Sequence, residues 1–350
     1  MGKVLILTDG KAGHENQSKA FARALGCDYD LVEVHFKSKA LKALSYLLDR
    51  VGVRTLRLLK VEADSCPLVK DVISISRTSG LETASTFCAV IGTGSGTFYA
   101  AKAVAKRLGV KCGVVLYPRG YHLASFDCVL APAFDRPKKA PNVIEIPANL
   151  VANDEAFYEK GVAAFAEKSG FQISDFKSQS SDDGKSKNAI AVIIGGPNKC
   201  STMTPAWMKA RLDEIFALRN RTIEQSEQSN NLSFWVTTSR RTPPEVEAVV
   251  DSYPWDYKLL YSKDHFNPIP AFVKLAKRLY VTAESTGMLS ESCTFGTAEV
   301  VALDNLKPGP HKFRRFVEDL RAAGYVDGNR KVDLSAQFAE ARRLMGLDGR

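Results

Sequence analysis

One short stretch near the N-terminus combines residue types that can move a proton and bind an anion. It reads DGKAGHENQ and follows an apolar run, residues 3–8, that we interpret as a buried strand. A histidine at the positive N-terminal end of a helix suits a neutral general base, and His14 could serve as one. Asp9, at the end of the strand, could be the base instead or could orient an acceptor hydroxyl. A turn histidine bonded to the backbone is the structural alternative for His14.

Polar, glycine-rich segments also follow five other predicted strands. They read GTGSGT (92–97), YPRGYH (117–122), GGPNK (195–199), TTSRRTP (237–243) and AESTGMLSES (283–292). The carboxyl ends of parallel strands lie at one edge of a sheet, so we expect these segments to converge on a ligand-binding crevice. Glycine lets the backbone approach a ligand closely, and helix N-termini offer N–H groups to a phosphate.

The second half of the chain supplies the cations that a diphosphate needs. Lys199, Arg240 and Arg241 would frame the phosphates together with nearby hydroxyls. The Glu291 carboxylate could accept hydrogen bonds from ribose or sugar hydroxyls. A solvated arginine pair and simple capping by the Ser-Thr pair of AESTG are the structural alternatives. The expected donor-binding residues are Gly195, Gly196, Lys199, Thr238, Ser239, Arg240, Arg241, Glu284, Ser285, Thr286, Gly287, Met288 and Glu291.

The first half would bind the acceptor. Lys11 lies in the same loop as His14 and could contact an anionic acceptor. The expected acceptor-binding residues are Gly10, Lys11, Gly13, Asn16, Gln17, Thr93, Gly94, Ser95 and Arg119.

Several familiar signatures are excluded by residue type or spacing. Thr97 stands where a dinucleotide fingerprint has glycine, and no acid follows at the ribose-binding distance, so NAD is not expected. Two positions from Ser95 on either side, where a nucleophile elbow has glycine, this chain has Thr93 and Thr97, and GGPNKCST lacks the phosphate-loop spacing. The five histidines show no metal-ligand spacing, so no metal or other cofactor is expected. The seven cysteines include no C-x-x-C pair, and we expect them to be reduced.

Strand and helix patterns alternate along both halves, which predicts an α/β fold with mainly parallel sheets. A length of 350 residues indicates about two domains. We expect two Rossmann-like domains that face each other across a cleft, residues 1–167 and 189–330. The polar segment 168–188 would link them, and residues 331–350 would form a C-terminal helix that could pack back on the first domain.

The net charge of +9 is unevenly distributed. Between Phe36 and Lys60, seven basic residues and a single acid, Asp49, are interleaved with leucine and valine. Such a segment favours an anionic surface. Because aromatics are almost absent from it and the chain has no nucleic-acid motif, we expect a membrane and no nucleic acid. A core-facing helix with a solvated cationic face is the alternative. Without a spanning segment or signal peptide, we expect a cytoplasmic protein that could lie peripherally on the membrane through residues 37–60.

The polar segments also resemble a known family. TDGKAGHENQ, VIGTGSGT, YPR with FDCVLAP, IIGGPNK, TTSRRTP and VTAESTGMLSE occur in the order found in the "elongated mitochondria" (mitochondrial-fission ELM) family. Its bacterial members are proposed glycosyltransferases of the GT-B fold, and the similarity covers about residues 3–325. The resemblance implies a nucleotide-sugar donor bound mainly by the second domain, an acceptor bound by the first, and no bound metal. In spacing, the GKAGH loop also matches the G-x-x-G-H loop of the related lipid-linked transferase of peptidoglycan synthesis.

Two departures from the family pattern affect what can be carried over. Where the family commonly has Asp-Ser followed by Ser-Met, this chain has Glu284, Ser285, Thr286, Gly287 and Met288, which leaves the choice of donor open. Where many members have His-Pro-Arg, this chain has Tyr117-Pro118-Arg119, which weakens any role for a histidine there.

Together, these patterns predict a metal-independent, inverting glycosyltransferase acting on a nucleotide-sugar and a cell-envelope or lipid-linked glycan, such as a lipopolysaccharide core. A base in the first domain would deprotonate the acceptor, and the cations of the second would stabilise the departing nucleotide diphosphate. Two other functions fit the same architecture: a nucleotide-sugar 2-epimerase and a non-catalytic, membrane-associated scaffold.

Overall fold

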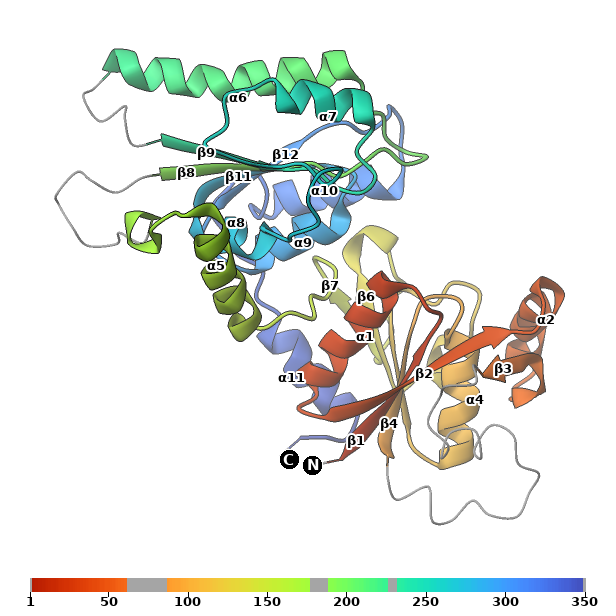
Figure 1. The fold of residues 1–350 in the computed structure, drawn as a ribbon. Coiled ribbons are helices and arrows are strands. Elements are labelled where there is room, and N and C mark those ends of the chain that lie inside the picture. The colour runs from red at the N-terminus through yellow and green to blue at the C-terminus, as the bar shows by residue number, and fades with distance from the viewer. Residues whose placement is uncertain (1, 62–86, 177–187, 226–231, 349–350) are drawn as a thin grey trace. The chain divides into compact units, whose positions relative to one another are not determined.

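A computed structural model describes residues 2–61, 87–176, 188–225 and 232–348. The chain divides into two units: unit 1 is Met1–Ala152 with Asp333–Arg350, and unit 2 is Asn153–Val332. Each unit contains one sheet with helices on both of its faces (Figure 1). The predicted α/β class with mainly parallel sheets is confirmed.

Within the described residues, the sheet of unit 1 has seven strands in the order β3-β2-β1-β4-β5-β6-β7. Neighbouring strands are parallel, except that β2 and β3 are antiparallel. The central strands are almost wholly buried and apolar, as a parallel sheet covered on both faces requires. The strands are β1 (Lys3–Thr8), β2 (Asp28–Phe36), β3 (Leu59–Val61), β4 (Phe87–Thr93), β5 (Lys111–Val115), β6 (Cys128–Pro132) and β7 (Val143–Ile146).

Helices α1 and α11 lie on one face of this sheet, and α4 lies on the other with α2 packed beside it (Figure 1). The core under α4 includes Leu5 and Leu7 of β1 and Val104 of α4, all fully buried. α11 contacts β6 and β7, so the C-terminal helix packs on unit 1. The helices are α1 (Ala12–Ala24), α2 (Lys39–Arg50), α4 (Phe98–Leu108) and α11 (Ser335–Leu344).

The described sheet of unit 2 has five strands, all parallel, in the order β10-β9-β8-β11-β12. Helices α6 and α7 cover one face, and α5, α8 and α9 cover the other (Figure 1). The strands are β8 (Asn188–Ile193), β9 (Leu232–Thr237), β10 (Tyr257–Leu259), β11 (Ala276–Thr282) and β12 (Glu299–Leu303). The helices are α5 (Glu155–Ser169), α6 (Pro205–Gln225), α7 (Pro244–Asp251), α8 (Ile269–Leu275), α9 (Thr286–Thr294) and α10 (Lys312–Ala322).

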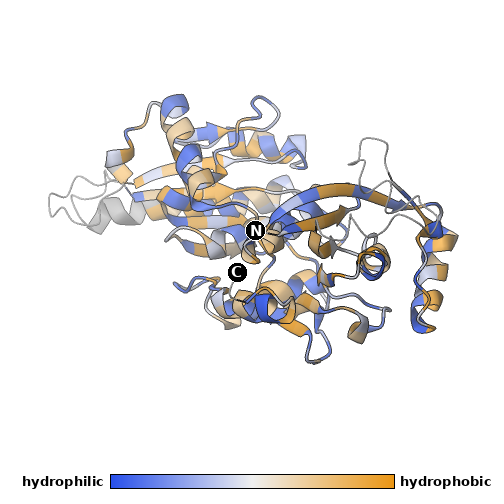
Figure 2. Ribbon diagram, turned by 90° about the horizontal axis from the view of Figure 1, so that it is seen from below, coloured by the Kyte–Doolittle hydropathy of each residue, from blue (hydrophilic) through white to orange (hydrophobic). Residues whose placement is uncertain are grey.

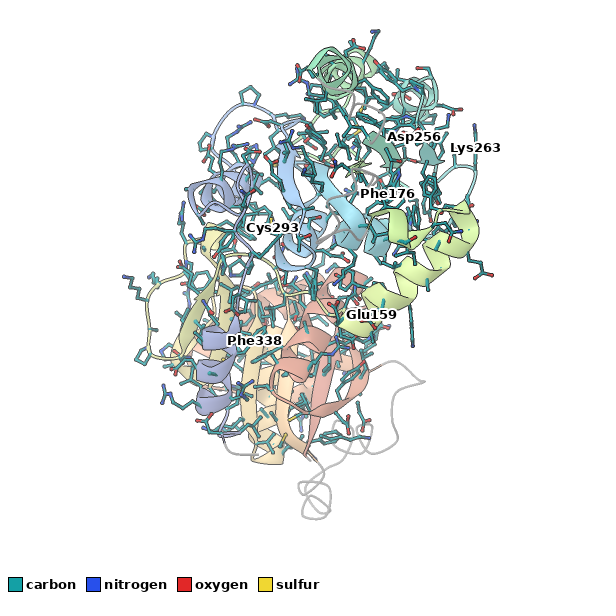
Figure 3. All side chains as sticks on the ribbon, turned by 90° about the vertical axis from the view of Figure 1, so that its left-hand side faces the viewer. Glu159, Phe176, Asp256, Lys263, Cys293 and Phe338 are labelled. Carbon is teal, nitrogen blue, oxygen red and sulfur yellow. The ribbon has the colours of Figure 1, made fainter. Side chains whose placement is uncertain are left out.

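An aromatic cluster fixes α5 to unit 2. The buried Trp235 of β9 lies 5.1 Å, between ring centroids, from Phe165 of α5 and 5.5 Å from Phe272 of α8. Phe176, labelled in Figure 3, joins the same cluster at 4.9 Å from Trp235. The boundary between the units therefore falls after Ala152 and not at residue 167. The expected linker 168–188 contains the end of α5 and a 3₁₀ turn at Ile173–Phe176, and its residues 177–187 lie outside the described residues.

In each sheet the strand order reverses beside the first strand. β2 lies on one side of β1 and β4 on the other, just as β9 and β11 lie on either side of β8. Open α/β sheets bind ligands at the carboxyl ends of the strands that flank such a reversal, because the connecting loops part there and leave a crevice. The fold therefore offers two ligand positions, one after β1 and β4 and one after β8 and β11.

Candidate functional site

Asp9 and His14 meet at the reversal point of unit 1. Asp9 follows β1, and His14 lies in the first turn of α1, where its Nδ1 atom is 2.9 Å from Asp9 Oδ1. The other carboxylate oxygen of Asp9 accepts a hydrogen bond from Lys11 Nζ. His14 Nε2 has no hydrogen-bond partner in the described part of the chain.

Two glycines of the segment after β4 enclose this pair. Gly94 has a φ of +83°, and a Cβ atom there would lie 2.7 Å from His14 Nδ1. A Cβ atom at Gly96 would lie 2.9 Å from Asp9 Oδ2. Both positions therefore need glycine because a side chain would displace the pair, and Gly94 needs it also for its backbone conformation.

The electrostatics of the pair favour an ionised Asp9. Burial alone would raise the pKa of this carboxyl, whose side chain is 6% exposed. The hydrogen bonds from Lys11 and His14 outweigh burial and hold the pKa of Asp9 below its ordinary value. An ionised carboxylate only accepts hydrogen bonds, so it favours the neutral His14 tautomer that carries its proton on Nδ1.

The remaining residues expected to bind the acceptor differ in their surroundings. Thr93 is buried, and its Oγ1 lies 2.6 Å from Ser18 Oγ, so it joins β4 to α1 and does not face a ligand. Arg119 is exposed and donates a hydrogen bond to the Asp135 carbonyl. The other expected residues lie in the segments that carry or enclose the Asp9–His14 pair and are partly or fully exposed. They are Gly10, Lys11, Gly13, Asn16, Gln17 and Ser95.

Helix α2 is fixed to unit 1 by one face and exposes the other. The buried Asp49 accepts hydrogen bonds from Lys102 Nζ of α4 at 2.8 and 2.9 Å. Lys42 Nζ donates to Ser95 Oγ at 2.9 Å, so α2 touches the segment that encloses the Asp9–His14 pair. Figure 2 shows polar and apolar residues together on α2, at the right of the view. Exposed on α2 and beside it are Leu44, Leu47, Val51 and Val53, with Lys37, Lys39, Arg50, Arg57 and Lys60.

In unit 2, the last residue of β11 and the loop after it hold the glycine pair that follows β8. Gly196 N donates to Glu284 Oε1 at 2.8 Å, and Gly195 N donates to Thr282 Oγ1 at 2.9 Å. The second oxygen of Glu284 accepts from Asn305 Nδ2 at 2.7 Å. Burial raises the pKa of Glu284 despite these hydrogen bonds. Glu284 is buried and both of its oxygens have internal partners, so in this structure it positions the glycine turn.

A second set of hydrogen bonds ties the loop after β9 to the same turn. Thr242 Oγ1 donates to the Gly195 carbonyl at 2.6 Å and accepts from Ser239 N at 2.9 Å. Thr238 is buried, donates to Glu247 and accepts from Tyr261 N. The expected ligand contact of Thr238 is thus replaced by an internal one. Thr242, which is not among the expected donor-binding residues, joins the two loops.

The three expected phosphate-binding cations of unit 2 are exposed. Lys199, Arg240 and Arg241 have no acidic partner among the residues that the structure describes. A Cβ atom at Gly196 would collide with the backbone carbonyl of Arg241, so the arginine pair is anchored against the glycine turn. Cations in this state keep their full hydrogen-bonding capacity for an anionic ligand.

The N-terminus of α9 is open to a ligand. Ser285 occupies the N-cap position, but its side chain makes no capping hydrogen bond, and Thr286 and Met288 are partly exposed. A Cβ atom at Gly287 would have no neighbour within 4 Å. The capping alternative for Ser285 therefore fails, and the first-turn N–H groups face no side-chain oxygen from it.

Glu291 lies one turn further along α9, and one of its two carboxylate oxygens already has hydrogen-bond partners. Its Oε1 accepts hydrogen bonds from the Tyr158 hydroxyl at 2.8 Å and from Asn153 Nδ2 at 3.3 Å. Burial raises the pKa of Glu291 despite these bonds. Neither Tyr158 nor Asn153 was expected, because sequence spacing does not show that α5 packs against α9.

The described residues contain neither a metal-binding cluster nor a membrane-spanning helix. No group of three histidine, cysteine or acidic side chains there is arranged to hold a metal ion. No helix among them combines the length and apolarity needed to cross a bilayer.

A family model described as "Mitochondrial fission ELM1" matches residues 12–343. The chain belongs to this family. The match includes His14, Gly94, Gly195 and Gly196 but begins after Asp9, Gly10 and Lys11, and it confirms the resemblance stated from the sequence. A search of the curated proteins found no match to this ELM1-family chain.

Solved structures similar to this ELM1-family protein have low sequence identity to it. A UDP-GlcNAc 2-epimerase from Neisseria meningitidis bound to UDP-GlcNAc has 11% identity and a TM-score of 0.45, with 98% of each chain covered. MurG of Acinetobacter baumannii has 14% identity and a TM-score of 0.42, covering 99% of this chain and 93% of that one. A UDP-glucosyltransferase from Polygonum tinctorium has 11% identity and a TM-score of 0.47, covering 100% and 90%.

Proposed function

We propose that this protein is a glycosyltransferase that moves a sugar from a nucleotide-sugar to a lipid-linked or cell-envelope glycan without a metal ion. The observation that supports it is the set of side chains found where the strand order reverses in each sheet. Unit 1 has a buried carboxylate beside a histidine with an unoccupied ring nitrogen. Unit 2 has exposed cations anchored at a glycine turn. Sugar transfer needs a base for the acceptor and a cationic site for the leaving diphosphate, and each unit supplies one of them.

In this proposal His14 is the general base and Asp9 orients it. His14 Nε2 takes the proton from the acceptor hydroxyl while that oxygen attacks the anomeric carbon of the donor. The ionised Asp9 carboxylate, 2.9 Å from Nδ1, stabilises the imidazolium that forms. A single displacement of this kind inverts the anomeric configuration.

Unit 2 would hold the donor. Lys199, Arg240 and Arg241 would neutralise the diphosphate as its bond to the sugar breaks, and the N–H groups at the start of α9 would add a partial positive charge. Glu291 would accept hydrogen bonds from ribose or sugar hydroxyls. Because Gly195 and Gly196 are fixed by internal hydrogen bonds, little reorganisation is needed when the charge develops.

We also propose that the basic segment 37–60 holds the protein on an anionic membrane surface, where a lipid-linked acceptor would lie. Support comes from the exposed leucine and valine side chains of α2 and from the basic residues around them. An apolar face bordered by lysine and arginine binds the boundary between headgroups and acyl chains. The Lys42–Ser95 contact would place the acceptor loop next to that surface.

The test of donor binding is a thermal-shift panel of UDP-, GDP-, CMP- and ADP-sugars with the full chain. A ligand that binds only the folded state stabilises it by about 2.7 kcal/mol at 100 times its Kd. We expect one nucleotide class to raise the unfolding temperature. No response across the panel would contradict the proposal. Conversion of the donor sugar without any acceptor, seen by NMR, would identify an epimerase instead.

A further inference from the structure

Two cysteines of unit 1 lie side by side at the N-terminal edge of its sheet. The sulfur atoms of Cys27 and Cys88 are 3.8 Å apart, although 61 positions separate them in the chain. Cys88 Sγ also lies 3.3 Å from the carbonyl of Lys3, the first residue of β1. Asp9 follows the other end of that strand, so this pair is separate from the proposed catalytic residues.

Local irregularities bring the two thiols together. Lys3 pairs with Phe87 and the next residue of β1 pairs with Ala89, so Cys88 is the extra residue of a β-bulge. Cys27 lies in the turn between α1 and β2, after Gly26 with its φ of +71°. A disulfide needs a sulfur–sulfur distance of about 2.05 Å. Because Cys27 lies in a turn and Cys88 in a bulge, the chain can adjust there without breaking the register of β1.

These two thiols are also more accessible than the deeply buried ones. Burial raises the pKa of Cys128 and of Cys293 to about 12, which keeps both as unreactive thiols. Cys27 lines a surface hollow of about 530 Å³ together with Lys3 and Arg23, and Cys88 lines another of about 670 Å³. Cys27 and Cys88 are partly exposed, whereas Cys128 and Cys293 are buried, so an oxidant can reach the Cys27–Cys88 pair from the surface.

We propose that Cys27 and Cys88 form a reversible disulfide when the protein meets a peroxide. The Cys27 thiolate attacks one oxygen of hydrogen peroxide, the O–O bond breaks, and the leaving hydroxide takes up a proton to become water. The Cys88 thiolate then attacks the sulfenic sulfur, the S–S bond forms as the S–O bond breaks, and the leaving hydroxide takes up a proton to become a second water. Two thiols and one peroxide give one disulfide and two waters: both sulfurs are oxidised and both peroxide oxygens are reduced.

The disulfide would join the turn after α1 to β4 across the start of β1. Closing a chain loop of this length restricts the unfolded chain and so stabilises the folded unit. Treatment with a small dithiol would reverse it by thiol–disulfide exchange. The consequence is a unit 1 whose stability depends on the redox state of its surroundings.

The experiment uses the full chain with Cys66→Ser, because Cys66 lies outside the described residues. After hydrogen peroxide, alkylation and trypsin digestion, we expect peptides 24–37 and 78–102 to be recovered as one linked species that dithiothreitol separates. We expect the oxidised protein to unfold about 5 °C higher than the reduced protein. The rise should vanish in Cys27→Ser and in Cys88→Ser and persist in the matched control Cys200→Ser. Reduced Cys27→Ser and Cys88→Ser should unfold at the parent temperature, which separates a lost disulfide from a damaged fold.

Recovery of both peptides separately alkylated after peroxide would overturn the proposal. So would a linked species found only between two protein molecules, or an oxidation-dependent rise in unfolding temperature that survives in Cys88→Ser.

Discussion

The ring of His14 packs against the backbone of Gly94, so closely that a Cβ atom at Gly94 would lie 2.7 Å from His14 Nδ1. The contact joins the first turn of α1 to the loop after β4, which are 80 residues apart in the chain. It makes glycine at this position a condition for the Asp9–His14 hydrogen bond. Because catalysis in the proposal depends on that hydrogen bond, the glycine can be tested separately from the histidine.

Gly94→Ala should reduce sugar transfer far more than it reduces stability. The added methyl group would push the His14 ring away from Asp9 and cost at least a 100-fold loss in kcat, in the range seen when a general base is misplaced. Gly109→Ala is the matched control: Gly109 has a φ of +69°, but a Cβ atom there meets nothing within 4 Å. Both variants should lose about 1 kcal/mol in chemical denaturation, and only Gly94→Ala should lose activity. Equal activities in the two variants would show that the contact with His14 has no catalytic role.

Arg240→Ala and Arg241→Ala should each weaken donor binding about tenfold, because an exposed cation that contacts a phosphate contributes a charge-assisted hydrogen bond. Isothermal titration with the nucleotide diphosphate of the responding donor measures the change. Lys209→Ala removes a cation from the same unit that is paired with Asp213, so it should leave the Kd unchanged. If the Kd for the nucleotide diphosphate is unchanged when both arginines are replaced, the phosphates do not bind at Arg240 and Arg241.

Glu284→Gln should be tolerated, whereas Glu284→Ala should destabilise unit 2 by about 2 to 4 kcal/mol. A glutamine can still accept the Gly196 N–H, and its amide can donate to Asn305 Oδ1, which has no partner in the structure, once the Asn305 amide rotates. Alanine leaves the Gly196 N–H and the Asn305 amide without this acceptor. Urea unfolding of the two variants measures the difference.

The stability of Glu284→Gln should also change with pH differently from that of the parent. Burial raises the pKa of Glu284 above 4.5 in the folded protein, so folding favours the protonated form and the parent loses stability as pH rises from 4.5 through the folded-state pKa. Glutamine does not titrate, so Glu284→Gln should gain stability relative to the parent as the pH is raised from 4 to 7. A difference that stays constant over this range would show that the carboxyl is not perturbed.

Leu47→Glu should weaken binding to vesicles that contain anionic phosphatidylglycerol by about tenfold. Leu47 is 58% exposed, so the change places a charge on the apolar face of α2 without disturbing the core. Sedimentation with vesicles measures the bound fraction. The control is Phe157→Glu on α5, another exposed apolar side chain, which should bind vesicles like the parent. Equal binding by both variants and the parent would exclude α2 as the membrane contact.

The sequence predicted the strands that carry the site more accurately than the contacts within it. The run after Met1 and Gly2 and the run around Ile91 are long, apolar and followed by glycine, so their strands and the helix at Phe98–Leu108 could be placed within a few residues. Asp9 and His14 could be paired as candidates because both lie where a strand ends and a helix begins. The sequence left open which of them is the base, and the proposed roles of His14 as base and Asp9 as the residue that orients it rest on the distance of 2.9 Å between Asp9 Oδ1 and His14 Nδ1.

What the sequence could not show were the partners supplied by distant elements. Glu284 was expected to touch the donor, yet it bonds to Gly196 and Asn305, which no local spacing reveals. The placement of α5 in unit 2 depends on Phe165 reaching Trp235, a contact between elements 70 residues apart. Tertiary packing determines the partners of Glu284 and the placement of α5, whereas the local sequence pattern indicates only which residues are apolar.

The central claim is tested most directly by comparing donor binding with turnover in His14→Ala, using the responding nucleotide-sugar and a membrane extract as the source of acceptor. The account predicts that His14→Ala binds the donor with the parent's Kd but releases nucleotide diphosphate at least 100-fold more slowly in the presence of the extract. Parent-like turnover by His14→Ala would contradict the account.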